Sequence, residues 1–261
     1  MGDEILTGGD VSQVVRVGDT VRRPTGPWTA AVHAFLIYLR KIGFSGTLEV
    51  LGIDEHGREI LRYIPGQVAT DPIPEWAAAD DVVESLAVFI REFHDAARSF
   101  TPPSNAIWQP WEGAPRSGDL IIHWDITTSN VVWRSGHPIA LIDFDFARPA
   151  PALFDLATAA KFWCPLFTDE RRAASRWPDV DPFRRLRALA ERYGLDKEQR
   201  RALPEFIRRK QEMGLQAHRA FADEGHPAFQ AMVHAGSLTR IAADLEWFEE
   251  HRAHVERALA G

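Results

Sequence analysis

Apolar and polar residues alternate in short runs through the first quarter of the chain, and this alternation predicts small antiparallel strands. The turn signals Gly8-Gly9-Asp10 and Gly18-Asp19 separate the first three runs. The predicted strands are Glu4 to Leu6, Val14 to Val17, Thr20 to Arg23, Leu48 to Ile53 and Arg58 to Ile64. Pro65-Gly66 follows the last of them and is a candidate hinge.

A helical period takes over elsewhere. Thr29 to Ile42 places Val32, Phe35, Leu36 and Leu39 on one face, and Asp80 to Phe100 does the same with Val82, Leu86, Phe89, Phe93 and Ala97. Three short strands are predicted at Leu120 to Ile122, Val131 to Trp133 and Ile139 to Asp143. The remainder, from Phe154, is predicted to be helical, with breaks near Pro165, Pro178, Gly194, Pro204, Gly214 and Gly225-His226-Pro227. We therefore expect two lobes, a small β lobe with the hinge over 1–66 and a larger, mainly helical lobe over 67–261.

Composition narrows the class of protein. The 261 residues are 45% hydrophobic and carry a formal net charge of −7, which argues against a general nucleic-acid-binding role because such surfaces need clustered Lys and Arg. Cys164 is the single cysteine, so no internal disulfide can form. The opening residues lack a basic segment followed by an apolar run, and no stretch is apolar for eighteen residues. We expect a soluble, cytoplasmic protein without a membrane partner.

Candidate chemistry lies in two neighbouring strings, His123-x-Asp125-x4-Asn130 and the later Asp143-Phe144. Phosphoryl transfer needs a group that accepts the proton of the substrate hydroxyl, and oxygen ligands for a divalent metal that bridges the phosphates. Asp125 could orient the attacking hydroxyl, while Asn130 and Asp143 offer the hard oxygen donors that Mg²⁺ prefers. A hairpin through Ser135-Gly136 should bring the last two together, and His123 is predicted to hold the loop.

The alternative is that these residues are ordinary loop polars, since turns favour Asp, Asn and Ser. A bare His-x-Asp-x4-Asn should occur by accident in roughly one chain of this length in a hundred. An accident must also supply apolar strands on both sides and a second apolar-Asp-Phe string at hairpin distance. The combined pattern therefore favours a phosphoryl-transfer site.

These strings resemble those of the phosphotransferase enzyme family, which includes aminoglycoside phosphotransferases, choline kinases and homoserine kinases. The resemblance reaches from the first strands to Phe154-Asp155-Leu156-Ala157. It implies an α+β, bilobal protein kinase-like fold and an ATP-dependent kinase that uses Mg²⁺. The acceptor would be a hydroxyl of a small molecule, such as an aminoglycoside-like or amino-alcohol compound. It also implies that Asp125 is the catalytic base, that Asn130 and Asp143 are metal ligands, and that Asp155 is structural and caps the following helix.

The resemblance places the nucleotide in the first lobe. It implies that Gly8 and Gly9 cover the phosphates and that the backbone of Leu61 to Ile64 meets the adenine, although Tyr63 could equally be a packing residue. Typical members carry a Lys on the third strand that contacts the α- and β-phosphates. All four lysines of this chain lie elsewhere, so Arg22 or Arg23 must substitute for it.

Other departures concern the residues around these groups. The helix predicted over Thr29 to Ile42 has no Glu to pair with the substituting cation; His33 occupies the corresponding place, and the usual ion pair is expected to be absent. Trp124 and Asp145 stand where members often have Gly. Trp124 is expected to pack rather than contact substrate, and Asp145 is either a further metal carboxylate or a solvated loop acid.

The acceptor is expected against the helical lobe, in contact with residues 150–170 and the last two helices. Acidic residues there, such as Asp169 and Glu249, could attract a polycation but are more typical of solvated helix faces. Trp108 and Trp111 could cap a cation or could pack. Two alternative functions stay open: a Ser/Thr kinase acting on a peptide of a natural-product pathway, and a non-catalytic nucleotide-binding or immunity module of the same fold.

Overall fold

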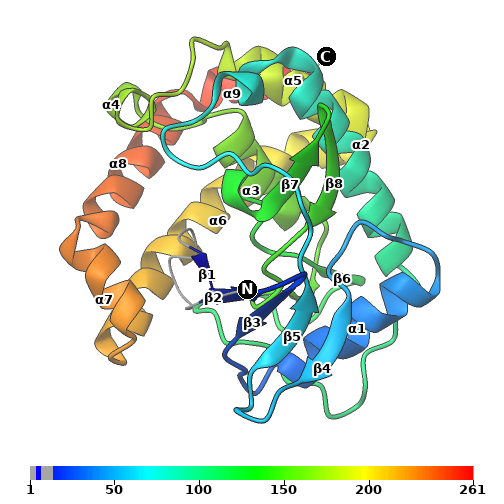
Figure 1. Ribbon diagram of the computed structural model, residues 1–261. Coiled ribbons are helices and arrows are strands. Elements are labelled where there is room, and N and C mark those ends of the chain that lie inside the picture. Colours follow the sequence, from blue (N-terminus) through cyan, green and yellow to red (C-terminus); the bar gives the residue numbers. More distant parts are fainter. Residues whose placement is uncertain (1–3, 7–13, 261) are drawn as a thin grey trace.

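The computed structural model describes residues 4–6 and 14–260. One part of the molecule is a small antiparallel sheet with one helix beside it, and the other part contains most of the helices (Figure 1). The strands of the sheet are β1 (Glu4–Leu6), β2 (Val14–Val17), β3 (Thr20–Arg23), β4 (Val50–Ile53) and β5 (Glu59–Arg62), in the order β1-β2-β3-β5-β4. The predicted phosphate-covering residues Gly8 and Gly9 lie outside the described residues.

The first three strands have the predicted bounds, and the last two are shorter than predicted. Strand β3 alternates between buried and half-buried positions, with Val21 and Arg23 on the buried side. Its partner β5 is antiparallel and in a register that sets Val21 opposite Leu61 and Arg23 opposite Glu59. Residues directly opposite each other point to the same face of a sheet. The register therefore brings a cation and an acid together.

Helix α1 (Thr29–Lys41) connects the two lobes through its apolar face. Phe35 and Leu39 on that face have no exposed surface. The ring of Phe35 lies 6.1 Å from that of Phe93 on α2 (Asp80–Ala97) and 6.3 Å from that of Phe144, which follows Asp143. All nine apolar positions predicted for these two helices are buried, which confirms both helical periods.

The second lobe contains two small two-stranded sheets and most of the helices. Strand β6 (Leu120–Ile122) pairs with β9 (Arg148–Ala150), and β7 (Val131–Arg134) pairs with β8 (His137–Leu141). The remaining elements are η1 (Glu75–Ala78), η2 (Thr128–Asn130), α3 (Leu153–Trp163), α4 (Asp169–Ala174), α5 (Pro182–Tyr193), α6 (Lys197–Asp223), α7 (Pro227–His234), α8 (Ser237–Glu250) and α9 (Arg252–Ala260). Strand β9 was not predicted because its central residue is Pro149, and proline is rare inside strands.

The candidate hinge makes a close backbone contact with the second lobe. A Cβ atom on Gly66 would lie 2.4 Å from Cγ1 of Val132 and 2.7 Å from the carbonyl oxygen of Trp133. The next residue, Gln67, exchanges two backbone hydrogen bonds of 2.8 and 2.7 Å with Trp133. Only glycine allows the chain to approach β7 this closely.

Helix α6 corrects the prediction of breaks at Pro204 and Gly214. It continues through both residues for 27 residues. A capping box formed by Asp196 and Gln199 begins it, and its contacts with α3, α7, α8 and α9 support it along its length. Tertiary packing therefore outweighs the loss of one backbone hydrogen bond at Pro204.

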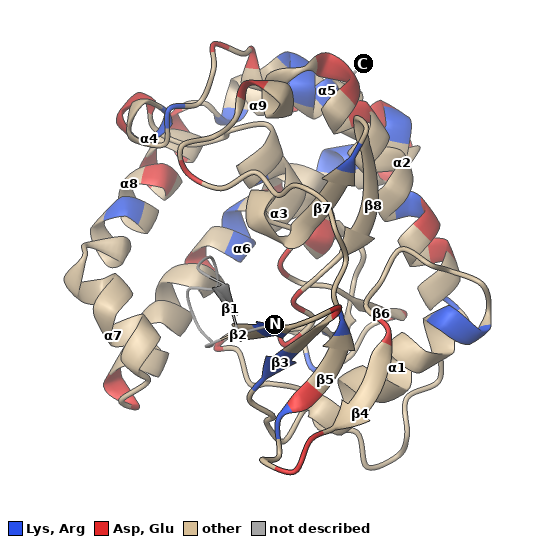
Figure 2. Ribbon diagram, in the orientation of Figure 1, with Lys and Arg blue, Asp and Glu red and all other residues tan. Residues whose placement is uncertain are grey.

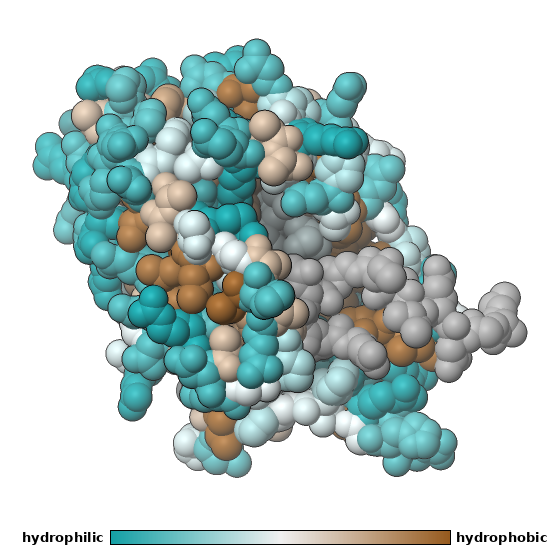
Figure 3. Space-filling view, turned by 90° about the vertical axis from the view of Figure 1, so that its left-hand side faces the viewer, coloured by the Kyte–Doolittle hydropathy of each residue, from teal (hydrophilic) through white to brown (hydrophobic). Residues whose placement is uncertain are grey.

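The outer face formed near α7 and α8 is largely hydrophilic, with a group of apolar residues near its middle (Figure 3). None of the helices in the described ranges is both long and apolar enough to cross a membrane.

Cys164, at the end of α3, is completely buried, and burial raises the pKa of its thiol to about 12. The thiol is therefore protonated and inert in the folded protein.

Candidate active site

The loop between β6 and β7 brings the predicted catalytic and metal-binding residues together. The side-chain amide of Asn130 donates to Oδ2 of Asp125 at 2.9 Å and to its backbone oxygen at 3.0 Å. The backbone N–H of Ile142 donates to the carbonyl oxygen of Asn130 at 3.0 Å, which places the following residue, Asp143, beside the same loop. Residues 18 positions apart in sequence thus share one small region.

Burial and nearby charges shift the pKa of the Asp125 carboxyl group. Burial raises its pKa, the charge of Lys210 opposes that rise, and the carboxylate of Asp143 adds to it. A carboxylate with a raised pKa holds a proton more readily than an exposed one. The Asp125 carboxylate is therefore more basic than that of an exposed aspartate.

His123 connects the loop to the segment before Asp143 through two hydrogen bonds. Its Nε2 donates to the backbone oxygen of Ile142 at 2.9 Å, and its Nδ1 accepts from the backbone N–H of Asp125 at 3.2 Å. One nitrogen donates and the other accepts, so the ring serves as a neutral bridge between the loop and the segment before Asp143. This geometry matches the predicted supporting role.

Asp155 also organises the loop, although not as a helix cap. It is the third residue of α3, whose N-cap position is Ala152, and it is fully buried. Its carboxylate accepts from the backbone N–H groups of His123 at 2.9 Å and Trp124 at 2.6 Å. It also accepts from Nε2 of His94 on α2 at 3.0 Å. The predicted capping role was wrong because the carboxylate points away from its own helix, to the loop.

We expect Asp155→Ala to destabilise the protein by roughly 3 kcal/mol or more, because three buried donors would lose their acceptor at about 1–3 kcal/mol each. Chemical unfolding followed by tryptophan fluorescence measures the change. Asp169→Ala is the matched control, since the side chain of Asp169 is 80% exposed. A loss for Asp155→Ala no larger than that of the control would contradict the proposed role of this carboxylate.

Trp124 is fully buried and has a φ of 73°, in the left-handed region that bulky residues avoid. Its ring makes cation–π contacts with two basic side chains. The guanidinium carbon of Arg148 lies 4.5 Å from the ring centroid, and Nζ of Lys210 lies 3.8 Å from it. The indole thus packs against the protein's own cations, as the packing interpretation predicted. This packing compensates for the unfavourable backbone conformation at a position where Gly would be unstrained.

Of the two arginines on β3, Arg23 reaches the site. Its Nε lies 2.7 Å from Oε1 of Glu59, its Nη1 lies 3.1 Å from Oδ1 of Asp143, and its Nη2 contacts Asp145. Arg22 instead hydrogen-bonds to Thr20 and lies 3.8 Å from Asp54. Adjacent residues of a strand point to opposite faces, so only one of the pair can face the acids.

An ion pair from a different element takes the place of the usual one. Glu59, from β5 rather than from the helix, pairs with Arg23, and it also lies 2.6 Å from Nε2 of His33 on α1. Arg23 is 6% and Glu59 4% exposed, so this is a buried pair. Burial by itself would lower the pKa of Arg23, but the carboxylates of Asp143, Asp145 and Glu59 outweigh it and raise the pKa, so the arginine stays charged.

Asp145 is not a solvated loop acid, because its side chain is only 17% exposed and contacts Arg23. Burial raises its pKa to about 6; the charge of Arg23 opposes that rise, and those of Asp143 and Glu59 add to it. The carboxyl group thus belongs to the cluster around Arg23. In this arrangement it helps to hold the arginine in place.

Asn130 and Asp143, the predicted metal ligands, have oxygen atoms that suit a divalent metal ion. The amide nitrogen of Asn130 is occupied by Asp125, which leaves its oxygen as a possible ligand, and the side chain of Asp143 is 40% exposed. Over residues 4–6 and 14–260, no group of three or more His, Cys, Asp or Glu side chains is arranged to hold a metal. One carboxylate and one amide suit Mg²⁺ that takes its remaining ligands from phosphates and water.

The residues predicted to meet the adenine lie in β5 and directly after it. Leu61 is 2% exposed and its side chain belongs to the core. The backbone N–H of Tyr63 donates to the carbonyl oxygen of Asp19 at 2.9 Å, and the guanidinium of Arg16 lies 3.9 Å from the ring centroid of Tyr63. Ile64 is half-buried beside it. The Tyr63 ring therefore packs, and any adenine contact in this segment falls to the backbone.

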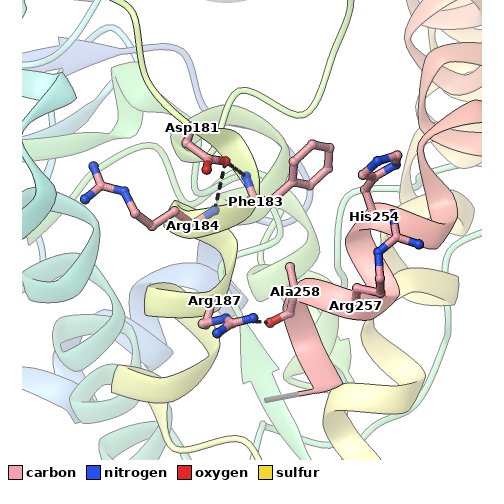
Figure 4. Close-up of a pocket in the computed structure, with 7 residues that line it drawn as sticks. All are labelled: Asp181, Phe183, Arg184, Arg187, His254, Arg257 and Ala258. Carbon is pink, nitrogen blue, oxygen red and sulfur yellow. Dashed lines mark hydrogen bonds between the residues drawn. The ribbon is translucent and has the colours of Figure 1, made fainter.

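Two cavities matter for the choice of an acceptor site. The larger, of about 370 Å³, lies between α5 and α9 and contains none of the residues above (Figure 4). The carboxylate of Asp181 in that cavity is already used to cap α5. The smaller, of about 170 Å³, includes Asp125 and is formed mainly by α3, α6 and α8. Residues 150–170 and the last two helices were predicted to contact the acceptor. Residues of α3 and α8 do line this cavity, but α9 does not, and α6, which was not predicted, does. A uniform helical period does not show which helices face the loop.

Comparisons with known proteins agree with this geometry. A model of the family described as "Phosphotransferase enzyme family" matches residues 105–203. The chain is 36% identical, over 206 residues, to the trifolitoxin immunity protein of Rhizobium leguminosarum bv. trifolii, and the match covers 77% of each protein.

Solved structures share the fold at low sequence identity. A choline/ethanolamine kinase family protein from Mesorhizobium loti is 15% identical, with a TM-score of 0.65, over 100% of this chain and 92% of that one. An amicoumacin kinase, solved with AMP-PNP, Ca²⁺ and Ami, is 13% identical with a TM-score of 0.63, over 98% and 88%. An aminoglycoside 2'-phosphotransferase-IIIa, solved with GDP, is 16% identical with a TM-score of 0.59, over 97% and 93%. The bilobal protein kinase-like fold is thereby confirmed, and the chain belongs to the phosphotransferase enzyme family.

Proposed function

We propose that this protein is an ATP-dependent O-phosphotransferase that acts on a hydroxyl group of a small molecule. The observation that carries the proposal is the position of Asp125. Its carboxylate is hydrogen-bonded to Asn130, one of the candidate metal ligands, and it also lines the cavity that could hold an acceptor. A group at this junction can contact both reactants.

The chemistry follows from these positions. Asp125 accepts the proton of the acceptor hydroxyl while the hydroxyl oxygen forms a bond to the γ-phosphorus. The bond from that phosphorus to the bridging oxygen of ATP breaks, and ADP leaves with the electron pair. Asn130 and Asp143 would hold Mg²⁺, which neutralises charge on the phosphate oxygens. Arg23, kept charged by its acids, is placed to contact the nucleotide phosphates from the sheet side.

The two lobes divide this work in the proposal. Residues 1–66, which contain the sheet and α1, would cover the nucleotide, and residues 67–261 would supply the catalytic loop and the acceptor cavity. The small size of the cavity supports a small molecule over a peptide, because a peptide needs an open groove rather than about 170 Å³ beside the base.

A second candidate is an immunity role, favoured by the 36% identity to a protein named for immunity to trifolitoxin. Immunity could rest on phosphorylation of a toxic compound or on nucleotide-dependent binding without transfer. The buried pair of Arg23 and Glu59 supports the catalytic form, because it keeps a charged residue on β3 that could contact phosphate although β3 has no lysine. ADP release in the presence of acceptors separates the two forms.

We expect ATP with Mg²⁺ to raise the melting temperature more than either alone, and Asp143→Asn to abolish that joint effect. Ligand at a hundred times its dissociation constant stabilises a protein by about 2.7 kcal/mol, which differential scanning fluorimetry detects. Asn tolerates the left-handed backbone at this position, where φ is 64°, so the variant should fold. Equal stabilisation of wild type and variant would remove Asp143 from the metal site.

A further inference from the structure

The cavity beside Asp125 is lined by an excess of cations. Among its lining residues, Lys161, Arg171, Lys210 and Arg240 are basic and Asp125 is the one carboxylate of the set. One more carboxylate, that of Asp244, contacts these side chains without lining the cavity. Its Oδ2 lies 3.1 Å from Nζ of Lys161 and also contacts Arg171. Figure 2 shows Lys and Arg positions on both α6 and α8, the helices that form this side of the cavity.

Lys210 is the cation nearest to the proposed chemistry. It is half-buried, and its Nζ lies 3.8 Å and 4.9 Å from the ring centroids of Trp124 and Trp111. Within the described residues, no carboxylate lies within 4 Å of this ammonium group. Trp111 therefore caps a cation, as one interpretation of the sequence had it, but the cation is the protein's own lysine.

The lysines of the cavity are held under conditions that disfavour their charge. Burial lowers the pKa of Lys210 to about 7; Asp125 and Asp155 oppose this, whereas Arg148 and Lys161 add to it. Burial also lowers the pKa of Lys161 to about 8, with Asp244 opposing and Arg171 adding. Keeping several cations close together is costly unless an anion is bound among them.

Polar atoms without partners also face this space. Gln211 is 2% exposed and lines the cavity, and neither its amide nitrogen nor its amide oxygen has a hydrogen-bond partner among the described residues. The indole N–H of Trp111 is likewise unpaired in that part of the chain. Buried polar groups are nearly always hydrogen-bonded in native proteins. A ligand with both donors and acceptors would satisfy them.

From these contacts we infer that the acceptor is a small hydroxy compound that carries an anionic group, a carboxylate or a phosphate. The anionic group would bind Lys210 and Lys161, and the hydroxyl would point to Asp125. This inference rests on the proposed phosphotransferase function. It disfavours a polycationic acceptor of the aminoglycoside type and a cationic amino alcohol, because four basic side chains would repel either one. The volume also lies below the about 300 Å³ at which typical drug-sized ligand sites begin.

Matched probes of similar size test the charge preference. Glycerate carries a carboxylate, glycerol 3-phosphate carries a phosphate, glycerol is neutral, and choline is cationic. Binding is measured by isothermal titration calorimetry without nucleotide, and transfer by ADP release with ATP and Mg²⁺. We expect at least one anionic probe to bind about tenfold or more tighter than glycerol and choline. The first two probes distinguish a carboxylate from a phosphate as the recognised group.

Lys210→Met tests the location. No carboxylate in the described part of the chain lies within 4 Å of this lysine, so the variant should fold, which its melting temperature checks. We expect binding of the preferred anion to weaken about tenfold or more. Lys197→Met is the matched control, because Lys197 is exposed and lies thirteen residues earlier on α6, about 20 Å away along the helix. Glycerate binding should also weaken as the pH rises from 6 to 9, since Lys210 and then Lys161 lose their protons while glycerate stays ionised.

The outcomes separate this inference from the proposed function. Anion binding that depends on Lys210, without ADP release for any probe, supports the charge of the cavity and counts against transfer. ADP release with choline or glycerol at rates equal to the anionic probes supports transfer and overturns the inference. Anion binding unchanged by Lys210→Met, or no binding of either anionic probe, also overturns it.

Discussion

Asp125→Asn should lower turnover by two or more orders of magnitude and leave nucleotide binding nearly unchanged. The amide cannot accept the proton of the hydroxyl, and loss of a positioned base costs about 10²–10⁴-fold in rate. The size of the side chain is preserved, so the hydrogen bond from the amide of Asn130 should be kept. Steady-state ADP release and a titration with a nonhydrolysable ATP analogue measure the two quantities, once an acceptor has been found.

Asp119→Asn is the matched control for this experiment. Asp119 is exposed and precedes β6 in the same segment of the chain, so the same change of charge is made outside the loop. Its turnover should equal that of the wild type. If Asp125→Asn keeps more than about half of the wild-type turnover, the base is not Asp125, whatever else the cavity binds.

Arg23→Met should destabilise the protein by about 3–5 kcal/mol and abolish measurable nucleotide binding. The substitution leaves Glu59, Asp143 and Asp145 without their common cation, and removing one partner of a buried ion pair leaves uncompensated charge in a poorly solvated place. The phosphate contact from the sheet is lost in the same step. Urea unfolding measures the free energy of unfolding, and calorimetry with ATP and Mg²⁺ measures the affinity.

The neighbouring arginine provides the control. Arg22→Met removes the same volume and charge from the opposite face of β3 and should change the free energy of unfolding by no more than about 1 kcal/mol. Arg23→Lys should recover most of the stability, because it keeps the charge, but a lysine cannot contact three acids as a planar guanidinium does. Equal effects of Arg22→Met and Arg23→Met would show that the acid cluster does not depend on Arg23.

Several features of this protein follow from the local sequence. The first three strands and the apolar faces of α1 and α2 were predicted correctly, because a period of two or of 3.6 residues depends only on neighbouring positions. The proposed catalytic loop was recognisable for a similar reason. Asp125 and Asn130 are five residues apart, so one short loop brings them together and the spacing is visible in the sequence.

Tertiary structure decided what distant segments contribute. Glu59 pairs with Arg23 because the register of β3 against β5 sets the two residues opposite each other. A strand register depends on pairing that no local pattern records, so this partner was not predicted. Pro204 and Gly214 did not end α6, since contacts with four other helices outweigh local preference.

The charge of the acceptor cavity shows the same division most clearly. Lys161, Lys210 and Arg240 lie on three different helices, and in the sequence each is one basic residue among many on an amphipathic face. The sequence by itself determined which residues could do phosphoryl chemistry, because those residues are close along the chain. Only the packing of α3, α6 and α8 determined the charge of the cavity beside Asp125, because electrostatic fields depend on distances in space.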